Sequence, residues 1–253
     1  MADAAPVRAL VARDALEAWS GSSITTGTHL EEKKKQALRV AQPLASVLPE
    51  GGFPRGGVVE IASPANLGHG LGIALSACSA CQDASTENGG EMAWCAFLDP
   101  DRTLFGPAVQ ASGVCLDRLL VLRPPRVLLA KVAVRVALSR IFSVIVVDVA
   151  AVPGASFPSR KEPRSESMDA WSKVTRRLSL AVEQTPTTVF LLTRSESLRS
   201  SALPVAMRIE LENGETGSLS VRVAKERYGR ITGPRRIAWT RPSRNAASAT
   251  TRG

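Results

Sequence analysis

Two periodicities of apolar residues divide the chain. Five apolar runs of strand length are each closed by polar or turn residues, at 58–62, 93–98, 119–122, 144–148 and 187–193. Between them lie segments with the three- and four-residue apolar spacing of a helix, at 71–81, near 112, at 126–140 and at 169–184. Apolar strands that alternate with helices are typical of an α/β fold, in which a mainly parallel sheet is flanked by helices on both faces.

After Leu203 the pattern changes to an alternation of apolar and polar residues. Such alternation predicts half-buried strands, and Asn213-Gly214 is a hairpin signal between two of them. The predicted strands are 205–211, 218–224, 230–232 and 236–240. The C-terminal part is therefore expected to form an antiparallel meander at the edge of the parallel core.

The N-terminal part has its own organisation. Residues 4–19 have helical spacing, residues 20–28 are a linker rich in Ser, Thr and Gly, and a second helical stretch is expected to end near Leu48. The prediction for the whole chain has three parts. They are an N-terminal helix and linker (1–30), a core domain (31–242) and a disordered basic tail (243–253).

Composition and the apolar runs narrow the class of protein. With 253 residues, 44% apolar and 22% charged, the chain can close one sizeable core. The N-terminus does not resemble a secretory signal, and no window reaches the roughly 18 apolar residues of a membrane span. We therefore expect a cytoplasmic protein with no membrane contact.

The four cysteines give no sign of a metal site. Cys78 and Cys81 form a C-x-x-C in a helix of small residues, no second such pair follows, and the chain has two histidines. We interpret these two residues, Cys95 and Cys115 as buried thiols in a reduced compartment, and we assign no metal-ligating residues.

The net charge of +9 is concentrated near the C-terminus. Residues 222–253 contain nine basic side chains and one acidic side chain, whereas residues 1–221 are nearly balanced. A basic segment of this kind indicates nucleic acid, an acidic partner or an anionic surface. A solvated tail that keeps the protein soluble is the other interpretation.

Nucleic acid is the partner that we predict for this segment, bound without sequence preference and with strong salt dependence. Tyr228 and Trp239 lie among the basic residues, where they either stack on bases or belong to the core. The loop 153–167 offers three further cations. The candidate DNA-binding residues are Arg222, Lys225, Arg227, Arg230, Arg235, Arg236, Arg241 and Arg244, with Arg160, Lys161 and Arg164 in the loop.

A candidate phosphate-binding loop follows the first strand of the predicted sheet. A working P-loop, G-x-x-x-x-G-K-[ST], needs a lysine for the outer phosphates and a hydroxyl for magnesium. Here Ser63 replaces the first glycine, His69 the lysine and Gly70 the hydroxyl residue. The degenerate nucleotide-binding set is Ser63, Asn66, Gly68, His69, Gly70 and Leu71.

Several motifs in order resemble the RecA recombinases. These are Gly51 to Pro64 before the phosphate loop, Phe97-Leu-Asp-Pro-Asp-Arg, Gly113 to Leu120, the Walker B-like Val144-Ile-Val-Val-Asp and Arg222-Val-Ala-Lys-Glu-Arg. The resemblance covers about residues 36–240 and implies a RecA-like core.

Within that superfamily the chain is most similar to the ImuA family, RecA-like accessory proteins of bacterial damage-induced mutagenesis. The similarity is carried by Gly-Gly-Phe-Pro-Arg-Gly at 51–56, the strand ending Asp99-Pro100, and Arg118-Leu-Leu-Val-Leu-Arg-Pro. It implies a role in the SOS response and translesion DNA synthesis. It also implies RecA, ImuB and an error-prone polymerase assembly as partners, and association with the nucleoid after damage.

The resemblance also transfers site residues. Asp101 stands where RecA has its water-activating glutamate, Asp148 is the Walker B acid and Arg194 replaces the glutamine that senses the γ-phosphate. Asp148 would hold magnesium through water or cap the next turn, and His69 would meet a phosphate or be a polar loop residue. Ala108 replaces the tyrosine that stacks on adenine. We expect weak ATP and magnesium binding and no efficient hydrolysis.

The first helix offers a candidate partner surface. RecA protomers join partly through an N-terminal helix, and in this chain six residues lie along one face of residues 4–19. That face either docks on a neighbour or packs on the chain's own core. The residues are Val7, Leu10, Val11, Ala15, Ala18 and Trp19.

Two other functions fit the sequence. One is a weak DNA-stimulated ATPase or recombinase that uses Asp101, Asp148 and His69. The other is a cell-division inhibitor of the SulA type, because those proteins share a degraded RecA-like core.

Overall fold

The computed structural model describes residues 37–64, 68–150, 168–195, 202–215 and 217–239, without the side chains of 168–170. The predicted N-terminal helix, the loop 153–167 and the tail 243–253 lie outside these residues. The same holds for Asn66, Arg160, Lys161, Arg164, Arg241, Arg244 and the six candidate partner-binding residues.

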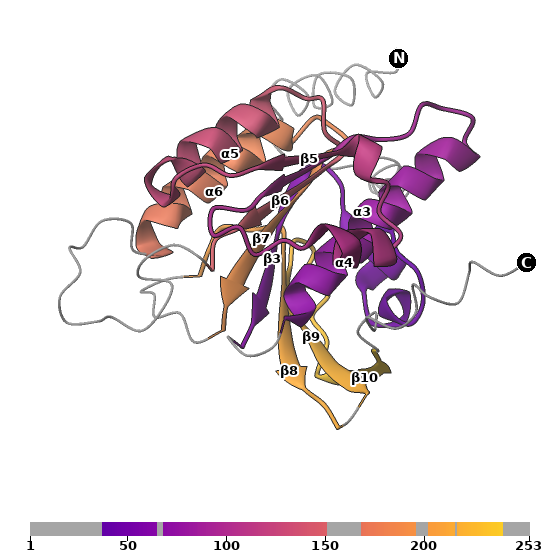
Figure 1. The fold of residues 1–253 in the computed structure, drawn as a ribbon. Coiled ribbons are helices and arrows are strands. Elements are labelled where there is room, and N and C mark those ends of the chain that lie inside the picture. The colour runs from indigo at the N-terminus through magenta and orange to yellow at the C-terminus, as the bar shows by residue number, and fades with distance from the viewer. Residues whose placement is uncertain (1–36, 65–67, 151–167, 196–201, 216, 240–253) are drawn as a thin grey trace, which may run out of the picture. The chain divides into compact units, whose positions relative to one another are not determined.

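An eight-stranded mixed sheet forms the centre of the described chain (Figure 1). Its strands lie in the order β10-β9-β8-β3-β7-β6-β4-β5. The six from β8 to β5 are parallel to one another, whereas β9 is antiparallel to both β8 and β10. The strands are β3 (Gly57–Ser63), β4 (Cys95–Leu98), β5 (Leu119–Leu122), β6 (Val144–Asp148), β7 (Thr188–Arg194), β8 (Met207–Asn213), β9 (Ser218–Glu226) and β10 (Arg235–Ala238).

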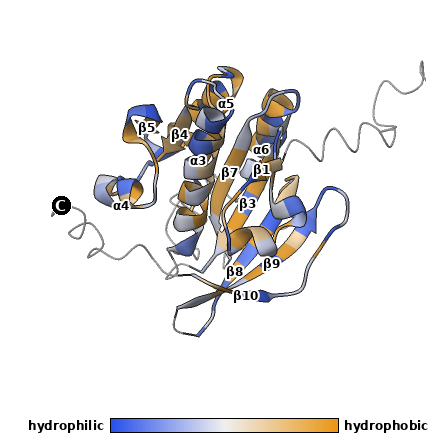
Figure 2. Cartoon of the chain, turned by 90° about the vertical axis from the view of Figure 1, so that its right-hand side faces the viewer, coloured by the Kyte–Doolittle hydropathy of each residue, from blue (hydrophilic) through white to orange (hydrophobic). Residues whose placement is uncertain are grey.

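Helices cover both faces of the parallel part (Figures 1 and 2). The helix α3 (His69–Glu87) packs on one face with a small antiparallel sheet of β1 (Ala37–Arg39) and β2 (Gly52–Pro54). The helices α5 (Leu129–Leu138) and α6 (Met168–Val182) pack on the other face. The remaining helices are α4 (Gly106–Ala111) and 3-10 turns at Leu44–Ser46, Pro49–Gly51, Leu116–Arg118 and Arg126–Leu128.

Each face has its own apolar core, because side chains alternate along a strand. On β3, Val59 and Ile61 point to the α3 face, whereas Val58 points to the α5 and α6 face. Trp171 of α6 is among the largest fully buried side chains. Near-complete burial on both sides explains why these strands read as continuous apolar runs.

The α/β prediction is confirmed, with a mostly parallel sheet, flanking helices and an antiparallel C-terminal region. The predicted helix that ends near Leu48 is wrong. Residues 37–39 form a strand instead, since Pro43 lacks the N–H that a helix needs and disfavours helical backbone at Gln42. The predicted strand 230–232 is not formed either, although the Thr232 N–H donates to the Val223 carbonyl at 3.1 Å.

A buried carboxylate links three neighbouring strands of the parallel part of the sheet. Glu60 on β3 is fully buried, accepts a hydrogen bond from the Thr193 hydroxyl at 2.8 Å and pairs with Arg208 at 3.3 Å. Burial raises the pKa of Glu60, and the Arg208 guanidinium and the Thr193 hydroxyl partly oppose that shift. Arg208 lies on β8 and also contacts Glu210 of the same strand at 3.0 Å, and its ion pair with Glu60 links β3 to β8 through charge.

Replacing Arg208 tests this link. Arg208→Ala should lower the free energy of unfolding by about 3 kcal/mol at pH 8, because the buried Glu60 carboxylate loses its compensating charge. The loss should be smaller at pH 5, since a carboxylate with a raised pKa is more readily protonated there. Urea unfolding at both pH values measures it.

The matched control is Arg222→Ala, which removes a more exposed partner of Glu210 and should change stability little. Adding Glu60→Gln to Arg208→Ala should recover most of the loss. Equal losses at pH 5 and pH 8 would mean that Arg208 acts by packing rather than by charge.

Candidate functional site

The carboxyl ends of the parallel strands bring the predicted site residues to one edge of the sheet. Ser63 at the end of β3 is paired with Arg194 at the end of β7. Asp148 ends β6 beside Leu192 of β7, and Asp99 directly follows β4. Ligands of open α/β sheets bind at this edge, so these side chains define the candidate site.

The degenerate phosphate loop keeps the position of a P-loop without its charge. Helix α3 begins at His69 after Gly68, which offers no side chain to cap it. His69 is half-buried, and Gly70 lies against the end of β3. A Cβ on Gly70 would lie 3.2 Å from the Ser63 Oγ and 3.3 Å from the Ile61 Cγ2. The space of a P-loop hydroxyl residue is therefore filled by Ser63 and Ile61.

Asp99 is the strand-end acid that caps the following turn. It is fully buried and accepts hydrogen bonds from the Thr103 N–H at 2.9 Å and from the Leu104 N–H at 3.1 Å. The guanidinium of Arg123 lies 3.7 Å away. Its role was not predicted, although the Asp-Pro-Asp sequence at the strand end is a signal for it.

Asp101, which the RecA resemblance predicts at the position of the water-activating residue, is held by an arginine. The Nε and Nη2 of Arg126 donate to its two carboxylate oxygens, each at 2.7 Å. This two-pronged geometry is the strong form of an Arg–carboxylate pair. Water activation by Asp101 would require this pair to open.

Asp148 has an altered proton affinity. Burial, and then the nearby charges of Asp101 and Asp99, raise the pKa of Asp148 to about 6. A hydrogen bond from the Ala150 N–H and the charge of Arg194 oppose the shift. Near neutral pH this carboxyl therefore exchanges its proton readily, unlike an ordinary aspartate.

The residues at this edge do not fit a magnesium site. In the part of the chain that the structure describes, no three His, Cys, Asp or Glu side chains are grouped to hold a metal ion. The Asp99 carboxylate already accepts hydrogen bonds from its own turn, and the Asp101 carboxylate is paired with Arg126. Gly70 has no hydroxyl to offer in place of the P-loop ligand. Hard divalent cations need several oxygen ligands, and Asp148 offers one carboxylate.

The candidate DNA-binding residues do not share one face. Arg222, Lys225 and Arg236 lie on the sheet face of Arg208, whereas Arg235 pairs with Val221 and lies on the opposite face. Carboxylates accompany several of them: Arg222 contacts Glu210 at 3.5 Å, Arg236 contacts Glu215 at 2.9 Å, and Arg230 contacts both Glu226 and Glu50. Arg227 is exposed.

The two aromatic residues of this region have different environments. Trp239 is partly buried against the core, and its ring lies 3.6 Å from the place of a Cβ on Gly72 of α3. Tyr228 is 46% exposed, with the Arg230 guanidinium 5.3 Å from its ring centre. Tyr228 is therefore the better candidate for stacking on a base.

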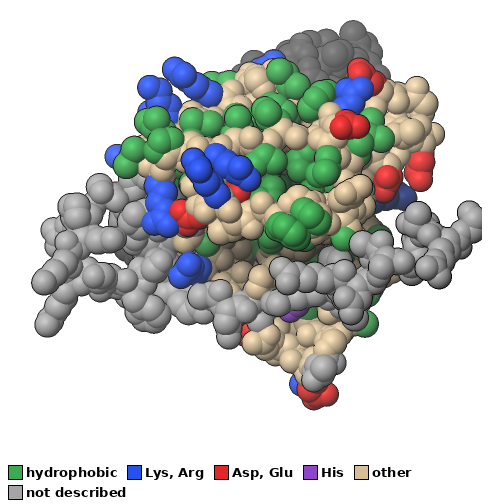
Figure 3. All heavy atoms as spheres, viewed as in Figure 1, with side chains coloured by type: hydrophobic (Ala, Val, Ile, Leu, Met, Phe, Trp, Pro, Cys, Tyr) green, Lys and Arg blue, Asp and Glu red, His purple; other side chains and the backbone are tan. Residues whose placement is uncertain are grey.

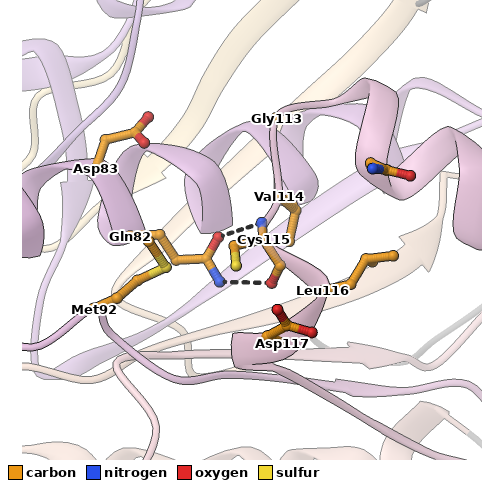
Figure 4. Close-up of a pocket in the computed structure, with 9 residues that line it drawn as sticks. Gln82, Asp83, Met92, Gly113, Val114, Cys115, Leu116 and Asp117 are labelled. Atoms are coloured by element: carbon orange, nitrogen blue, oxygen red, sulfur yellow. Dashed lines mark hydrogen bonds between the residues drawn. The ribbon is translucent and has the colours of Figure 1, made fainter. Parts of the chain in front are cut away.

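A pocket of about 490 Å³ lies away from the strand ends (Figure 4). Gln82 on α3 accepts a hydrogen bond from the Cys115 N–H at 2.9 Å and donates to the Cys115 carbonyl at 3.2 Å, which ties α3 to the segment before β5. About 20 Å of helix separates Asp83 from His69. The pocket is lined by Gln82, Asp83, Met92, Gln110, Gly113, Val114, Cys115, Leu116 and Asp117.

The cysteines are free thiols, as predicted, and three of them are buried. Cys115 is half-buried in the pocket wall. Burial raises the pKa of Cys81, and a hydrogen bond with Cys78 followed by burial raises that of Cys95. Thiols with raised pKa values are poor nucleophiles, which fits a packing role.

Asp148 gives a test of the strand-end electrostatics. Because its pKa is raised in the folded state, ionisation destabilises the protein as the pH rises from about 4 to 6, and the cost persists above. Asp148→Asn keeps an oxygen for the Ala150 N–H and should raise the free energy of unfolding at pH 7.5 by about 1–3 kcal/mol. At pH 4 it should change little.

Urea unfolding at the two pH values checks this, with the exposed Asp117→Asn as the control that should have no effect. A loss of stability in Asp148→Asn at pH 7.5 would contradict the electrostatic account.

No helix in the described ranges is long and apolar enough to cross a membrane. No protein-family model matches this chain, and no curated protein matches it.

Proposed function

We propose that the chain is a catalytically degenerate RecA-like accessory protein of DNA-damage-induced mutagenesis. It acts in translesion DNA synthesis by binding RecA, ImuB or both, together with DNA. The observation that carries the proposal is the Asp101–Arg126 pair, which occupies the position of a catalytic base with a neutralised carboxylate. The RecA-like and ImuA-like motifs supply the biological setting.

The fold supports a nucleotide-binding ancestry without nucleotide chemistry. A strand, a loop and the helix α3 lie in the P-loop order, and Asp148 ends a strand at the same edge of the sheet. His69 replaces the lysine that would neutralise the outer phosphates. A charge-assisted phosphate contact contributes about 1.5–3 kcal/mol, so two or three missing contacts lower affinity by several orders of magnitude.

Interactions with macromolecules then carry the function. The basic residues of β9, β10 and the segments beyond them contact the DNA backbone, with Tyr228 available to stack on a base. The carboxylates beside Arg222, Arg230 and Arg236 keep this contact weak enough to yield to a partner. The error-prone polymerase assembly is recruited through RecA or ImuB, and the protein acts in the cytoplasm at damaged DNA of the nucleoid.

The N-terminal helix gives the test of partner binding. The chain without residues 1–20 should lose capture of purified RecA by at least tenfold, because the face of Val7, Leu10 and Val11 docks on the neighbour. The full chain with Leu10→Ala and Val11→Ala should show an intermediate loss, and Arg13→Ala, on the opposite side of the predicted helix, is the matched control. Undiminished capture by the truncated chain would remove this route to RecA.

A weak DNA-stimulated ATPase is the second candidate. The pKa of Asp148 favours it, since a carboxyl that titrates near 6 is suited to proton transfer close to neutral pH. Under this alternative, Asp101 would have to leave Arg126 during turnover.

Phosphate release in the presence of single-stranded DNA separates the two candidates. The accessory role predicts background release, unchanged in Asp148→Ala. Turnover that is stimulated by DNA, lost in Asp148→Ala and kept in the control Asp117→Ala would establish the enzyme instead.

A further inference from the structure

The helices α5 and α6 repeat one pattern of exposed side chains. In α5, Lys131, Arg135 and Leu138 are spaced by four and three residues and are exposed. In α6, Lys173, Arg177 and Leu180 repeat the same spacing and are also exposed. Because one turn takes 3.6 residues, each set forms a row along one side of its helix.

Both rows point away from the sheet. The opposite side of α5 is buried through Leu129, Ala133 and Ala137. The opposite side of α6 is buried through Trp171 and Leu178. Each helix therefore places its apolar stripe on the core and its Lys-Arg-Leu row in solvent.

The two rows lie side by side in the same direction. The helices contact each other on one face of the sheet, and each connects two parallel strands, so both run opposite to the strands. In both rows the lysine is therefore nearest the start of the helix, the arginine follows and the leucine is nearest the end. We call this surface, with Arg176, the α5–α6 face.

The cations of this face lack acidic partners among the described residues. Lys131, Arg135, Lys173, Arg176 and Arg177 make no ion pair with any carboxylate that the structure describes. Like charges four residues apart on a helix repel, so the pairs in each row slightly destabilise the free protein. On β9 and β10, in contrast, Arg222 and Arg236 each contact a carboxylate.

Exposed apolar side chains accompany these cations. Leu180 is 73% exposed and Leu138 is 58% exposed, with Ile141 at 61% just beyond α5. Figure 3 shows Lys and Arg side chains beside apolar ones on the side of the molecule where α5 lies. Cations at one end and leucines at the other indicate a ligand that is acidic at one end and apolar at the other.

We propose that the α5–α6 face binds an acidic segment of a partner protein that also carries apolar residues. Its carboxylates pair with the lysine and arginine rows, and its apolar side chains cover Leu138 and Leu180. Charge complementarity identifies the acidic part, and the exposed leucines favour a polypeptide over nucleic acid, because a phosphate backbone offers nothing that buries them. This surface is separate from the proposed DNA contact.

A labelled synthetic peptide tests the proposal on the full chain. The probe is a fluorescein-labelled peptide of about 16 residues with Glu in one half and Leu three and four apart in the other, followed by anisotropy. Lys131→Glu with Lys173→Glu should weaken its binding by about tenfold or more. Each new glutamate lies four residues before an arginine, so the thermal midpoint should hold or rise, which separates lost binding from lost folding.

The leucines are tested separately. Leu138→Ser with Leu180→Ser should lower the affinity for the peptide by about fivefold. The same peptide with Ser in place of Leu should bind the wild-type chain correspondingly less well. The matched control is Arg222→Glu with Arg236→Glu, which should leave the peptide unaffected and weaken a single-stranded oligonucleotide of about 20 nucleotides. The control thereby tests the proposed DNA contact independently.

Three results would overturn the proposal. The first is peptide binding that persists in Lys131→Glu with Lys173→Glu. The second is equal binding of the Leu and Ser peptides, which would make the face a general polyanion site. The third is a larger fold-loss of affinity for the oligonucleotide, or for vesicles of phosphatidylserine, than for the peptide in Lys131→Glu with Lys173→Glu. That result would assign the face to nucleic acid or to a membrane surface.

Discussion

Burial of both faces of a parallel sheet is the constraint on which the rest of this structure depends. Parallel strands cannot be joined by tight turns, so every connection between β3 and β8 crosses a face of the sheet. The crossings place α3 on one face and α5 and α6 on the other. They also bring all the strand carboxyl ends to one edge, which gathers Ser63, Asp148 and Arg194 from distant parts of the sequence.

At this edge, which we propose as a degenerate nucleotide site, most of the carboxylates have partners. Asp101 is matched by Arg126, and Asp99 is absorbed by backbone N–H groups of its own turn. Burial, and then the charges of Asp101 and Asp99, raise the pKa of Asp148. Five cations without an ion pair among the described carboxylates lie together on the outer side of α5 and α6, which makes this surface available to an anionic partner.

Much of the fold follows from sequence periodicity, and the exceptions have physical causes. Strands such as 119–122 and 144–148 could be predicted because two-sided burial requires continuous apolar residues. The stretch before Leu48 was predicted as a helix because Val40, Leu44 and Leu48 have helical spacing, yet Leu38 pairs with Phe53 in a small sheet. Helix α3 runs beyond the predicted end at 81.

In the polar last turns of α3, the hydroxyl groups of Ser85 and Thr86 donate hydrogen bonds to backbone carbonyls one turn earlier.

The site was predictable as a location but not as a set of contacts. The Walker B-like motif predicts that Asp148 lies at the end of its strand. The sequence also shows that His69 stands where the P-loop pattern has a lysine. The Asp101–Arg126 pair joins residues 25 positions apart, and no local pattern announces it. The Lys-Arg-Leu repeat can be recognised in the sequence. That the two rows form one surface follows only from the contact between α5 and α6 on one face of the sheet.

The contact between Gly70 and Ser63 has a consequence for substitutions at these two positions. Set against the P-loop pattern, Ser63 stands in place of a glycine and Gly70 in place of a hydroxyl residue. A side chain restored at 70 alone would press on the Ser63 Oγ and on Ile61, at 3.2 and 3.3 Å. A side chain can therefore enter position 70 only if Ser63 or Ile61 shifts by a few tenths of an ångström, so positions 63 and 70 are coupled in what they tolerate.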